Sequence, residues 1–427
     1  MNRIDTVVIG AGHAGLALSR LLTVAGWEHV GLDRGRVAER WRSERWDSLH
    51  LLSPNWLARL PGWSYGGADQ DGFMSAAQFI AYLEGYAESF GAPVQSGTTV
   101  EDLSACATGY AVVTDKGAWR SRHVVIATGP WGAPVVPTGL DRRGLDRLGR
   151  RDCVLSASAY RNPKQLADGG VLVVGASASG VQIADELVRG GRRVILAVGR
   201  HTRMPRRYRG MDAYWWLERT GRLARTIDEV DPQAARAEPS LQLVGRSDVD
   251  RDTDDLDLVA LQSRGVQLVG RLASVDKRGV AGFRDDLAAT TAAADRTLHS
   301  FLDTVDTHIE RTGLTSEVWP AMRPRRFVAT ATPSTRLDLA SEQISTVVLA
   351  AGYRPHHPWL RLPITDLDGS IQQCRGVTSA PGAYVVGLRF QHRRDSAMID
   401  GARHDARAVV SHLYTGSTEP ASMGVPR

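Results

Sequence analysis

Two glycine-rich segments carry the residue types and the spacing that hold the phosphates of a nucleotide. The first loop is Gly10-Ala11-Gly12-His13-Ala14-Gly15 and the second loop is Gly175-Ala176-Ser177-Ala178-Ser179-Gly180. In such a loop one glycine permits a tight turn, the next lets the backbone approach a pyrophosphate, and the third lets a helix sit against a strand. The N–H groups at the start of that helix then bind the anion. We therefore expect two dinucleotides, bound by Gly10, Gly12, Gly15, Gly175, Ser177, Ser179 and Gly180.

The first loop stands in the sequence context that a dinucleotide site needs. An aliphatic run over 5–9 precedes it, helical apolar spacing follows over 14–25, and a second strand-like run covers 29–33. This order predicts a strand–helix–strand unit. The unit ends in Asp33, where a carboxylate can bind a ribose hydroxyl, although a solvated acid at a strand end is the alternative.

The second loop departs from the pattern at Ser177, whose hydroxyl can bond a phosphate. The strand-like run over 193–198 that follows is continued by Arg200 rather than by an acid. A carboxylate at this place selects the 2′-hydroxyl of NAD, whereas an arginine suits the 2′-phosphate of NADP. We expect Arg200, with Arg203 as a further candidate, to bind NADPH. A solvated basic surface explains the later arginines equally well, namely Arg206, Arg207 and Arg209.

The composition excludes several classes of protein. The net charge of +5 comes almost wholly from arginine, and no basic stretch alternates with aromatic residues as a nucleic-acid platform would. The three cysteines are scattered singly, without the CxxC pair of a disulfide reductase, and no residues are spaced as metal ligands. We therefore expect no nucleic-acid partner and no metal site.

The same features bear on location. Sparse cysteines suit a reducing compartment, the first strand begins within five residues of Met1, and no apolar run reaches transmembrane length. The sequence therefore predicts a soluble, cytoplasmic protein without stable membrane insertion. It leaves a homodimer open.

The chain is organised as one α/β fold interrupted by another. Prolines mark a linker before the second unit, and the polar, proline-rich stretch 318–335 marks the return. The prediction is an α/β fold with two Rossmann-like dinucleotide-binding domains, for FAD and NADPH, the second inserted into the first. Residues 1–163 and 330–427 would form the FAD-binding domain and residues 164–329 the NADPH-binding domain. Further expected elements are helices over 75–90, 284–313 and 395–413 and strands over 111–114, 119–126, 266–270, 346–351 and 383–387.

The sequence resembles the class B flavin-dependent monooxygenases, the flavin-containing and Baeyer–Villiger type, in a compact bacterial form. The resemblance spans essentially the whole chain. Besides the loops and Asp33, it rests on Trp41-Arg42, Ala127-Thr128-Gly129, Tyr160-Arg161-Asn162-Pro163 and Ala350-Ala351-Gly352-Tyr353-Arg354-Pro355. It implies further cofactor contacts from Arg34, Trp41, Thr128, Gly129, Gly352 and Gly387.

The resemblance also implies an activity. In that family NADPH reduces FAD, and O2 then forms a C4a-(hydro)peroxyflavin that transfers one oxygen atom to a small organic substrate. Retained NADP⁺ and a dry pocket protect this species, because water would destroy it. N-oxidation, S-oxidation and Baeyer–Villiger insertion all fit the sequence.

Two family motifs are missing. FxGxxxH, counted back from Tyr160, falls on Arg150, Asp152 and Ser156, and the Thr-Asn pair of the animal enzymes falls on Leu51-Leu52. His50 and Asn55 remain as candidate catalytic residues, with loop packing as the alternative for both. Trp215 and Trp216 could line a substrate pocket or belong to the core. The run Arg393-Arg394-Asp395 could be a helix cap with a solvated flank.

These absences keep two rival functions open. One is an NADPH-dependent flavoprotein reductase, dehydrogenase or oxidase that transfers no oxygen atom. The other is a non-catalytic nucleotide-binding or redox-sensing protein, against which two intact loops argue.

Overall fold

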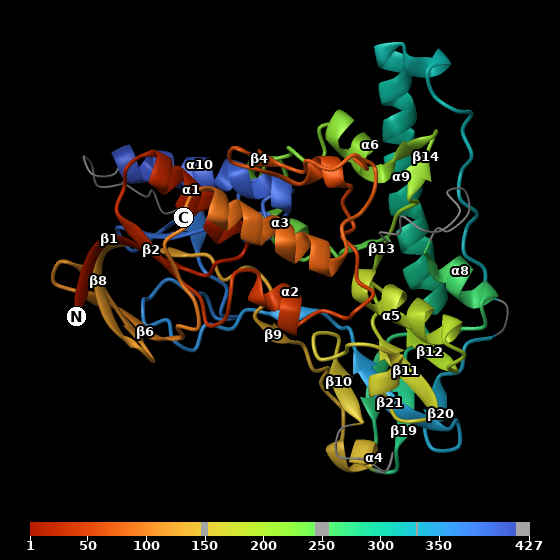
Figure 1. The fold of residues 1–427 in the computed structure, drawn as a ribbon. Coiled ribbons are helices and arrows are strands. Elements are labelled where there is room, and N and C mark those ends of the chain that lie inside the picture. Colours follow the sequence, from red (N-terminus) through yellow and green to blue (C-terminus); the bar gives the residue numbers. More distant parts are fainter. Residues whose placement is uncertain (147–152, 244–255, 330–331, 416–427) are drawn as a thin grey trace, which may run out of the picture.

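Two sheets of mostly parallel strands organise the chain (Figure 1). The computed structural model describes residues 1–146, 153–243, 256–329 and 332–415. Each sheet contains a strand, a glycine-rich loop and a helix in succession, as the sequence predicts. The α/β class with two Rossmann-like units, the second inserted into the first, is confirmed.

The first sheet is built around the first loop. Its parallel part has the order β25-β8-β1-β2-β5, extended on one side by the antiparallel strands β24 and β23, and a hairpin of β6 and β7 continues from β8. The bounds are β1 Asn2–Ile9, β2 His29–Leu32, β5 Val94–Gln95, β6 Val100–Cys106, β7 Gly109–Thr114, β8 Gly117–Ile126, β23 Gln373–Cys374, β24 Val377–Thr378 and β25 Ala383–Val385.

Three helices pack together beside this sheet. They are α1 (His13–Val24), α3 (Ala76–Ser89) and α10 (Ile399–Thr415), and their buried apolar side chains share one core. A capping box fixes the start of α3, since the Ser75 hydroxyl accepts from the N–H of Gln78 while the Gln78 side chain accepts from the N–H of Ser75. The bounds of α3 and α10 confirm the expected helices over 75–90 and 395–413 within a few residues.

The second sheet is entirely parallel, in the order β10-β21-β11-β12-β17. Its strands are β10 Val154–Ser156, β11 Gly170–Val174, β12 Val194–Ala197, β17 Gln267–Val269 and β21 Ile344–Leu349, and α5 (Ala178–Arg189) joins β11 to β12. Two of these strands, β10 and β21, lie outside residues 164–329, to which we had expected the second domain to be confined. Parallel neighbours lie far apart in sequence, so an apolar run does not show which sheet it joins. The domain division stays a proposal, with its boundaries moved to before β10 and after β21.

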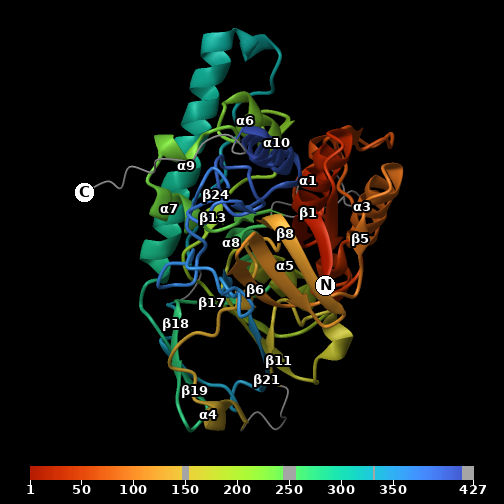
Figure 2. The ribbon, with the colours of Figure 1, turned by 90° about the vertical axis from the view of Figure 1, so that its left-hand side faces the viewer.

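A long helix, α9 (Leu287–Thr312), runs along the side of the molecule away from α1 and α3 (Figure 2). Its buried face packs against α6 (Ala213–Arg219), where the Trp216 side chain is fully buried and donates to the backbone carbonyl of Tyr208. Trp216 therefore belongs to the core. Within the described ranges, no helix is long and apolar enough to cross a membrane.

Shorter elements complete the described chain. They are α2 Glu39–Ser43, β3 Arg59–Leu60, β4 Trp63–Ser64, β9 Ala133–Pro134, α4 Arg142–Asp146, β13 Thr202–Arg203, β14 Arg207–Tyr208, β15 Met211–Asp212, α7 Pro232–Arg236, β16 Leu241–Gln242, α8 Leu258–Ser263, β18 Leu272–Val275, β19 Val280–Phe283, β20 Arg336–Asp338 and β22 Tyr353–Arg354, with single 3₁₀ turns at Asn55–Leu57, Pro163–Gln165, Ile227–Glu229 and Leu314–Ser316.

Candidate functional site

A cavity of about 1650 Å³ is lined by both glycine-rich loops, at the carboxyl ends of strands from both sheets. Ligands of open parallel sheets bind at this edge. The volume exceeds the few hundred to about 1,000 Å³ that is usual for a single drug-sized ligand. Most of the expected cofactor-binding residues line this cavity, namely Gly10, Gly12, Asp33, Arg34, Trp41, Thr128, Gly129, Gly175, Ser177, Ser179, Arg200, Gly352 and Gly387.

The two loops have the same backbone geometry. Gly12, directly before α1, has φ −79° and ψ −178°, and Ser177, directly before α5, has φ −83° and ψ −173°. A Cβ on Gly15 would lie 2.0 Å from the Gly10 carbonyl oxygen, and one on Gly180 would lie 1.8 Å from that of Gly175. The last glycine of each loop therefore lets the helix meet the strand.

The starts of α1 and α5 are open to a ligand. A Cβ on Gly12 would meet no atom within 4 Å, so this position faces free space in the cavity. Neither Gly12 nor Ser177 caps its helix through a side chain. The helix N–H groups and the Ser177 hydroxyl therefore remain available to phosphate oxygens.

Asp33 is fixed beside the first loop. One carboxylate oxygen accepts from the Ala11 N–H at 2.7 Å and the other from the Gly35 N–H at 2.9 Å. Trp41 packs edge-on against Phe79, with ring centroids 4.7 Å apart. Arg34 is exposed and pairs with Glu44, so of the predicted side chains at this end Asp33 is the best placed for a ribose.

Among the described residues, Nδ1 of His357 and two further buried polar atoms of the cavity wall near the first loop have no hydrogen-bond partner. The latter two are the Thr128 hydroxyl oxygen, next to Gly129, and Nε2 of His13 within the first loop. Burial lowers the pKa of His13 to about 4, so its ring is neutral at physiological pH. Such atoms are rare and indicate where a ligand completes the hydrogen bonding. The residues present therefore fit a flavin dinucleotide, and His13 is a further candidate contact that the sequence did not predict.

Arg200 lies in the cavity wall after β12. Its guanidinium donates to the Ala237 backbone carbonyl, and no carboxylate among the described residues pairs with it. Arg236 and Arg271 line the same cavity. A cationic group thus lies where the sequence predicts the 2′-phosphate of NADP to bind.

Arg203 is placed differently from our expectation. Its buried guanidinium is bound to Asp257 at 2.6 Å and to Asp295 at 2.5 Å, and it does not line the cavity. Its prediction as a cofactor ligand is therefore wrong, because two carboxylates already occupy its N–H groups. Arg206 and Arg209 likewise pair with aspartates, whereas Arg207 is exposed.

The two candidate catalytic residues separate in the structure. His50 lines the cavity, and its Nδ1 lies 3.0 Å from the Ser48 carbonyl oxygen, which leaves Nε2 for a ligand. Asn55 is buried outside the cavity wall, where its amide nitrogen donates to the Asp69 carbonyl and its oxygen accepts from the Met74 N–H. Asn55 is therefore a loop-packing residue and is not retained as a catalytic candidate.

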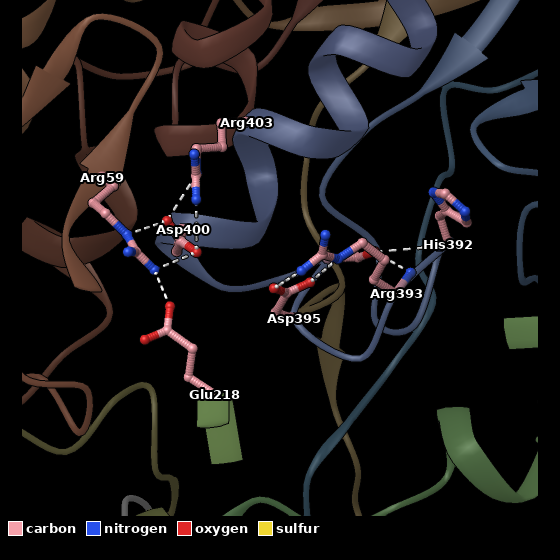
Figure 3. Close-up of polar contacts among 8 residues, drawn as sticks. Arg59, Glu218, His392, Arg393, Asp395, Asp400 and Arg403 are labelled. Atoms are coloured by element: carbon pink, nitrogen blue, oxygen red, sulfur yellow. Dashed lines mark hydrogen bonds and ion pairs between the residues drawn. The ribbon is translucent and has the colours of Figure 1, made fainter. Parts of the chain in front are cut away.

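The start of α10 is tied to other elements by ion pairs (Figure 3). Asp400 accepts from Arg59 at 2.7 Å and from Arg403 at 2.8 Å, and Arg59 also pairs with Glu218 of α6. Asp395 is buried, and its two carboxylate oxygens accept hydrogen bonds from Nε and Nη2 of Arg393. The expectation of a solvated flank at 393–395 is therefore wrong.

This region also contains a grouping of possible metal ligands. Asp395, Asp400 and His404 offer ligand atoms within 4.8 Å of one another. Arginines already neutralise both carboxylates, so the group serves as an ion-pair network.

The chain is similar to known oxidoreductases. A family model described as pyridine nucleotide-disulphide oxidoreductase matches residues 7–225. The "Uncharacterized oxidoreductase CzcO-like" of Geobacillus kaustophilus (strain HTA426) is 28% identical over 96% of this chain and 98% of its own length. Indole-3-pyruvate monooxygenase YUCCA1 of Oryza sativa subsp. japonica is 32% identical over 45% of this chain and 47% of its own. The solved flavin-containing monooxygenase from Stenotrophomonas maltophilia has a TM-score of 0.62 at 20% identity, covering 97% of this chain and 100% of that one.

Proposed function

We propose that the chain, which belongs to the pyridine nucleotide-disulphide oxidoreductase family, is a class B flavin-dependent monooxygenase that inserts one oxygen atom from O2 into a small organic substrate at the expense of NADPH. It is an oxidoreductase with FAD and NADPH as its cofactors. The proposal covers the reaction type, the preference for NADPH and the residues that act.

One observation carries the proposal, namely that a single cavity is lined by both dinucleotide loops. Hydride transfer requires the nicotinamide and the flavin to meet, and one shared cavity allows this. The first loop, Asp33 and Thr128 would hold FAD, while the second loop and Arg200 would hold NADPH. The bound flavin supplies the acceptor for the hydride and the activation of O2.

The protein's own part is to position the reactants and to exclude water. Leu51, Leu52 and Ile399 line the cavity with apolar side chains, and such a wall keeps water from the reacting atoms. His50 adjoins this wall and offers Nε2 as a proton donor or acceptor toward substrate. Nitrogen, sulfur and carbonyl carbon remain alternative sites of oxidation.

A second candidate function is a reductase or oxidase that transfers no oxygen atom. The loop-bound Asn55 favours it, because its carboxamide is engaged by the Asp69 carbonyl and the Met74 N–H and does not replace the missing Thr-Asn pair. FxGxxxH is also absent from the sequence, and two of the positions counted for it, Arg150 and Asp152, lie outside the described residues.

Turnover with NADPH under oxygen-18-labelled O2 tests the proposal, using a panel of amines, thioethers and ketones. We expect one labelled oxygen atom in the product of at least one class, with less peroxide formed than NADPH consumed. The Gly12→Val variant, which we expect to lack FAD, is the control for background oxidation. Peroxide equal to NADPH without label in any product would support the oxidase instead.

A further inference from the structure

Arg389 lines the cavity two residues after Gly387, at the end of β25. Its guanidinium lies over the Trp131 ring, 5.7 Å from the centroid, and donates to the backbone carbonyl of Glu238. Both partners are electrically neutral. The side chain is therefore held in a defined place while most of its N–H groups remain available.

No carboxylate among the described residues forms an ion pair with Arg389. The nearest acid, Glu238, pairs with Arg394 at 2.7 Å through its side chain. Burial lowers the pKa of Arg389, the charge of Glu238 raises it, and the charge of Arg394 lowers it again. A partly buried cation whose neighbouring carboxylate is already paired with another arginine is incompletely neutralised, so its place in a cavity wall indicates that a bound anion supplies the missing charge.

Tyr214 offers a second donor in the same cavity. It is buried apart from its contact with the cavity, and no hydrogen-bond partner for its hydroxyl occurs among the described residues. Burial raises the pKa of Tyr214 to about 12, so the phenol keeps its proton. Tyr214 and Arg389 both line this cavity. A guanidinium and a phenol together can bind the two oxygens of a carboxylate.

The cofactor phosphates have other donors. The pyrophosphates are matched by the N–H groups that open α1 and α5, and the 2′-phosphate by Arg200, with Arg236 and Arg271 in the same wall. Arg200 donates to Ala237, whereas Arg389 donates to the next carbonyl, that of Glu238. Each of the two guanidinium groups is therefore held by its own backbone carbonyl, and Arg389 is not needed for the contact that we assign to Arg200.

We propose that Arg389, assisted by Tyr214, binds the carboxylate of an anionic organic substrate. This inference rests on the proposed function, because it names the substrate class of the same cavity. It also makes a prediction for binding alone, since a carboxylate without an oxidisable group should occupy the same place.

Benzoate provides the binding test, and a sulfide pair provides the turnover test. Benzoate is titrated into the FAD-loaded enzyme, and the flavin absorbance change gives its Kd. KM is then measured for 4-(methylthio)benzoate and for its methyl ester. We expect the carboxylate to have the lower KM, and Arg389→Met to raise both the benzoate Kd and the carboxylate KM roughly tenfold to hundredfold, as for loss of a charge-assisted hydrogen bond. The ester KM should change less than twofold, Arg389→Lys should restore part of the affinity, and Tyr214→Phe should weaken carboxylate binding to a smaller extent.

Arg222→Met is the matched control. Arg222 lies over Phe301 in the same electrostatic neighbourhood of Glu238 and Arg394 but does not line the cavity. Its loss removes one positive charge and should leave the benzoate Kd unchanged. Equal loss of carboxylate and ester binding in Arg389→Met, or a higher KM for NADPH alone, would overturn the inference, as would a wild-type enzyme that binds no benzoate. If benzoate binds through Arg389 but no product carries oxygen-18, the proposed function fails while the anion site stands.

Discussion

The carboxylate of Asp33 accepts a 2.7 Å hydrogen bond from the backbone N–H of Ala11, which ties the end of β2 to the first loop. At the second loop the corresponding strand, β12, leads to Arg200, whose guanidinium binds the Ala237 carbonyl. The two loops share a backbone geometry, but one site presents a fixed anion and the other a cation. This difference suits a ribose hydroxyl at the first site and a phosphorylated ribose at the second. It is the physical basis for assigning FAD to the first loop and NADPH to the second.

A side chain added at Gly12 should affect FAD binding, whereas a side chain added at Gly15 should affect folding. Gly12 has an extended backbone and empty space around its missing Cβ, so Gly12→Val should fold with the thermal stability of wild-type protein stripped of FAD. It should purify colourless, because the valine occupies the place of the phosphate. Gly15→Ala puts a Cβ 2.0 Å from the Gly10 carbonyl and should lower Tm by several degrees or prevent folding. If Gly12→Val retained stoichiometric FAD, the first loop would not be the part of the chain that binds FAD.

We predict that Arg200 sets the preference for NADPH over NADH. Arg200→Ala removes one charge-assisted contact to the 2′-phosphate and should raise KM for NADPH roughly tenfold to hundredfold. KM for NADH should change less than twofold, because NADH lacks this phosphate. Steady-state kinetics with both nucleotides measures the split, with Arg361→Ala, which lies outside the cavity wall, as the control. If KM for NADPH were unchanged, Arg236 or Arg271 would have to bind the 2′-phosphate in place of Arg200.

Local patterns in the sequence predicted the parts of the fold that depend on neighbouring residues. Both loops, their helices, α3, α9 and α10 follow from apolar spacing and glycine positions, since these features act over a few residues. The sheet membership of β10 and β21 could not be predicted in this way. Their pairing joins residues such as Val154 and Val347, and no local signal encodes that partnership.

The same difference between local and long-range signals applies to the side chains of the site. Residues inside a motif, such as Asp33 and Thr128, lie in the cavity wall, where their contact with a cofactor stays a prediction. His13 could have been found because it lies within the first loop. Arg203 was misassigned because its partners, Asp257 and Asp295, are distant in sequence. Arg389 was missed for a related reason: its environment comes from Trp131 and Glu238, which the fold brings together.

The buried group of Arg203, Asp257 and Asp295 predicts a large effect on stability. Arg203→Met would leave two carboxylates without their counterion and should lower the free energy of unfolding by about 3–5 kcal/mol. Urea unfolding, followed by circular dichroism, measures the loss. Arg361→Met breaks the exposed pair with Asp102 and should cost less than about 1 kcal/mol. A similar small loss for both variants would contradict a structural role for Arg203.

Asp405 predicts a dependence of stability on pH. Its side chain is buried in α10, and neither carboxylate oxygen has a hydrogen-bond partner of good geometry in the part of the chain that the structure describes. Burial, with a further contribution from Asp395, raises the pKa of Asp405 to about 7, above its value of about 3.9 in an unfolded chain. The folded state therefore favours the protonated form. The stabilisation is complete below about pH 4 and is lost as pH rises through about 7.

Asp405→Asn isolates this contribution, because the amide has nearly the same shape and carries no charge at any pH. The variant should match wild type near pH 4 and become more stable above pH 7, by up to about 4 kcal/mol. Urea unfolding of both proteins at intervals from pH 4 to pH 8.5 gives the difference curve, in which other titrating groups cancel. Asp71→Asn, at an exposed site, is the control for loss of one negative charge. A difference between Asp405→Asn and wild type that stays constant across this range would show that Asp405 has the same protonation in the folded and unfolded states.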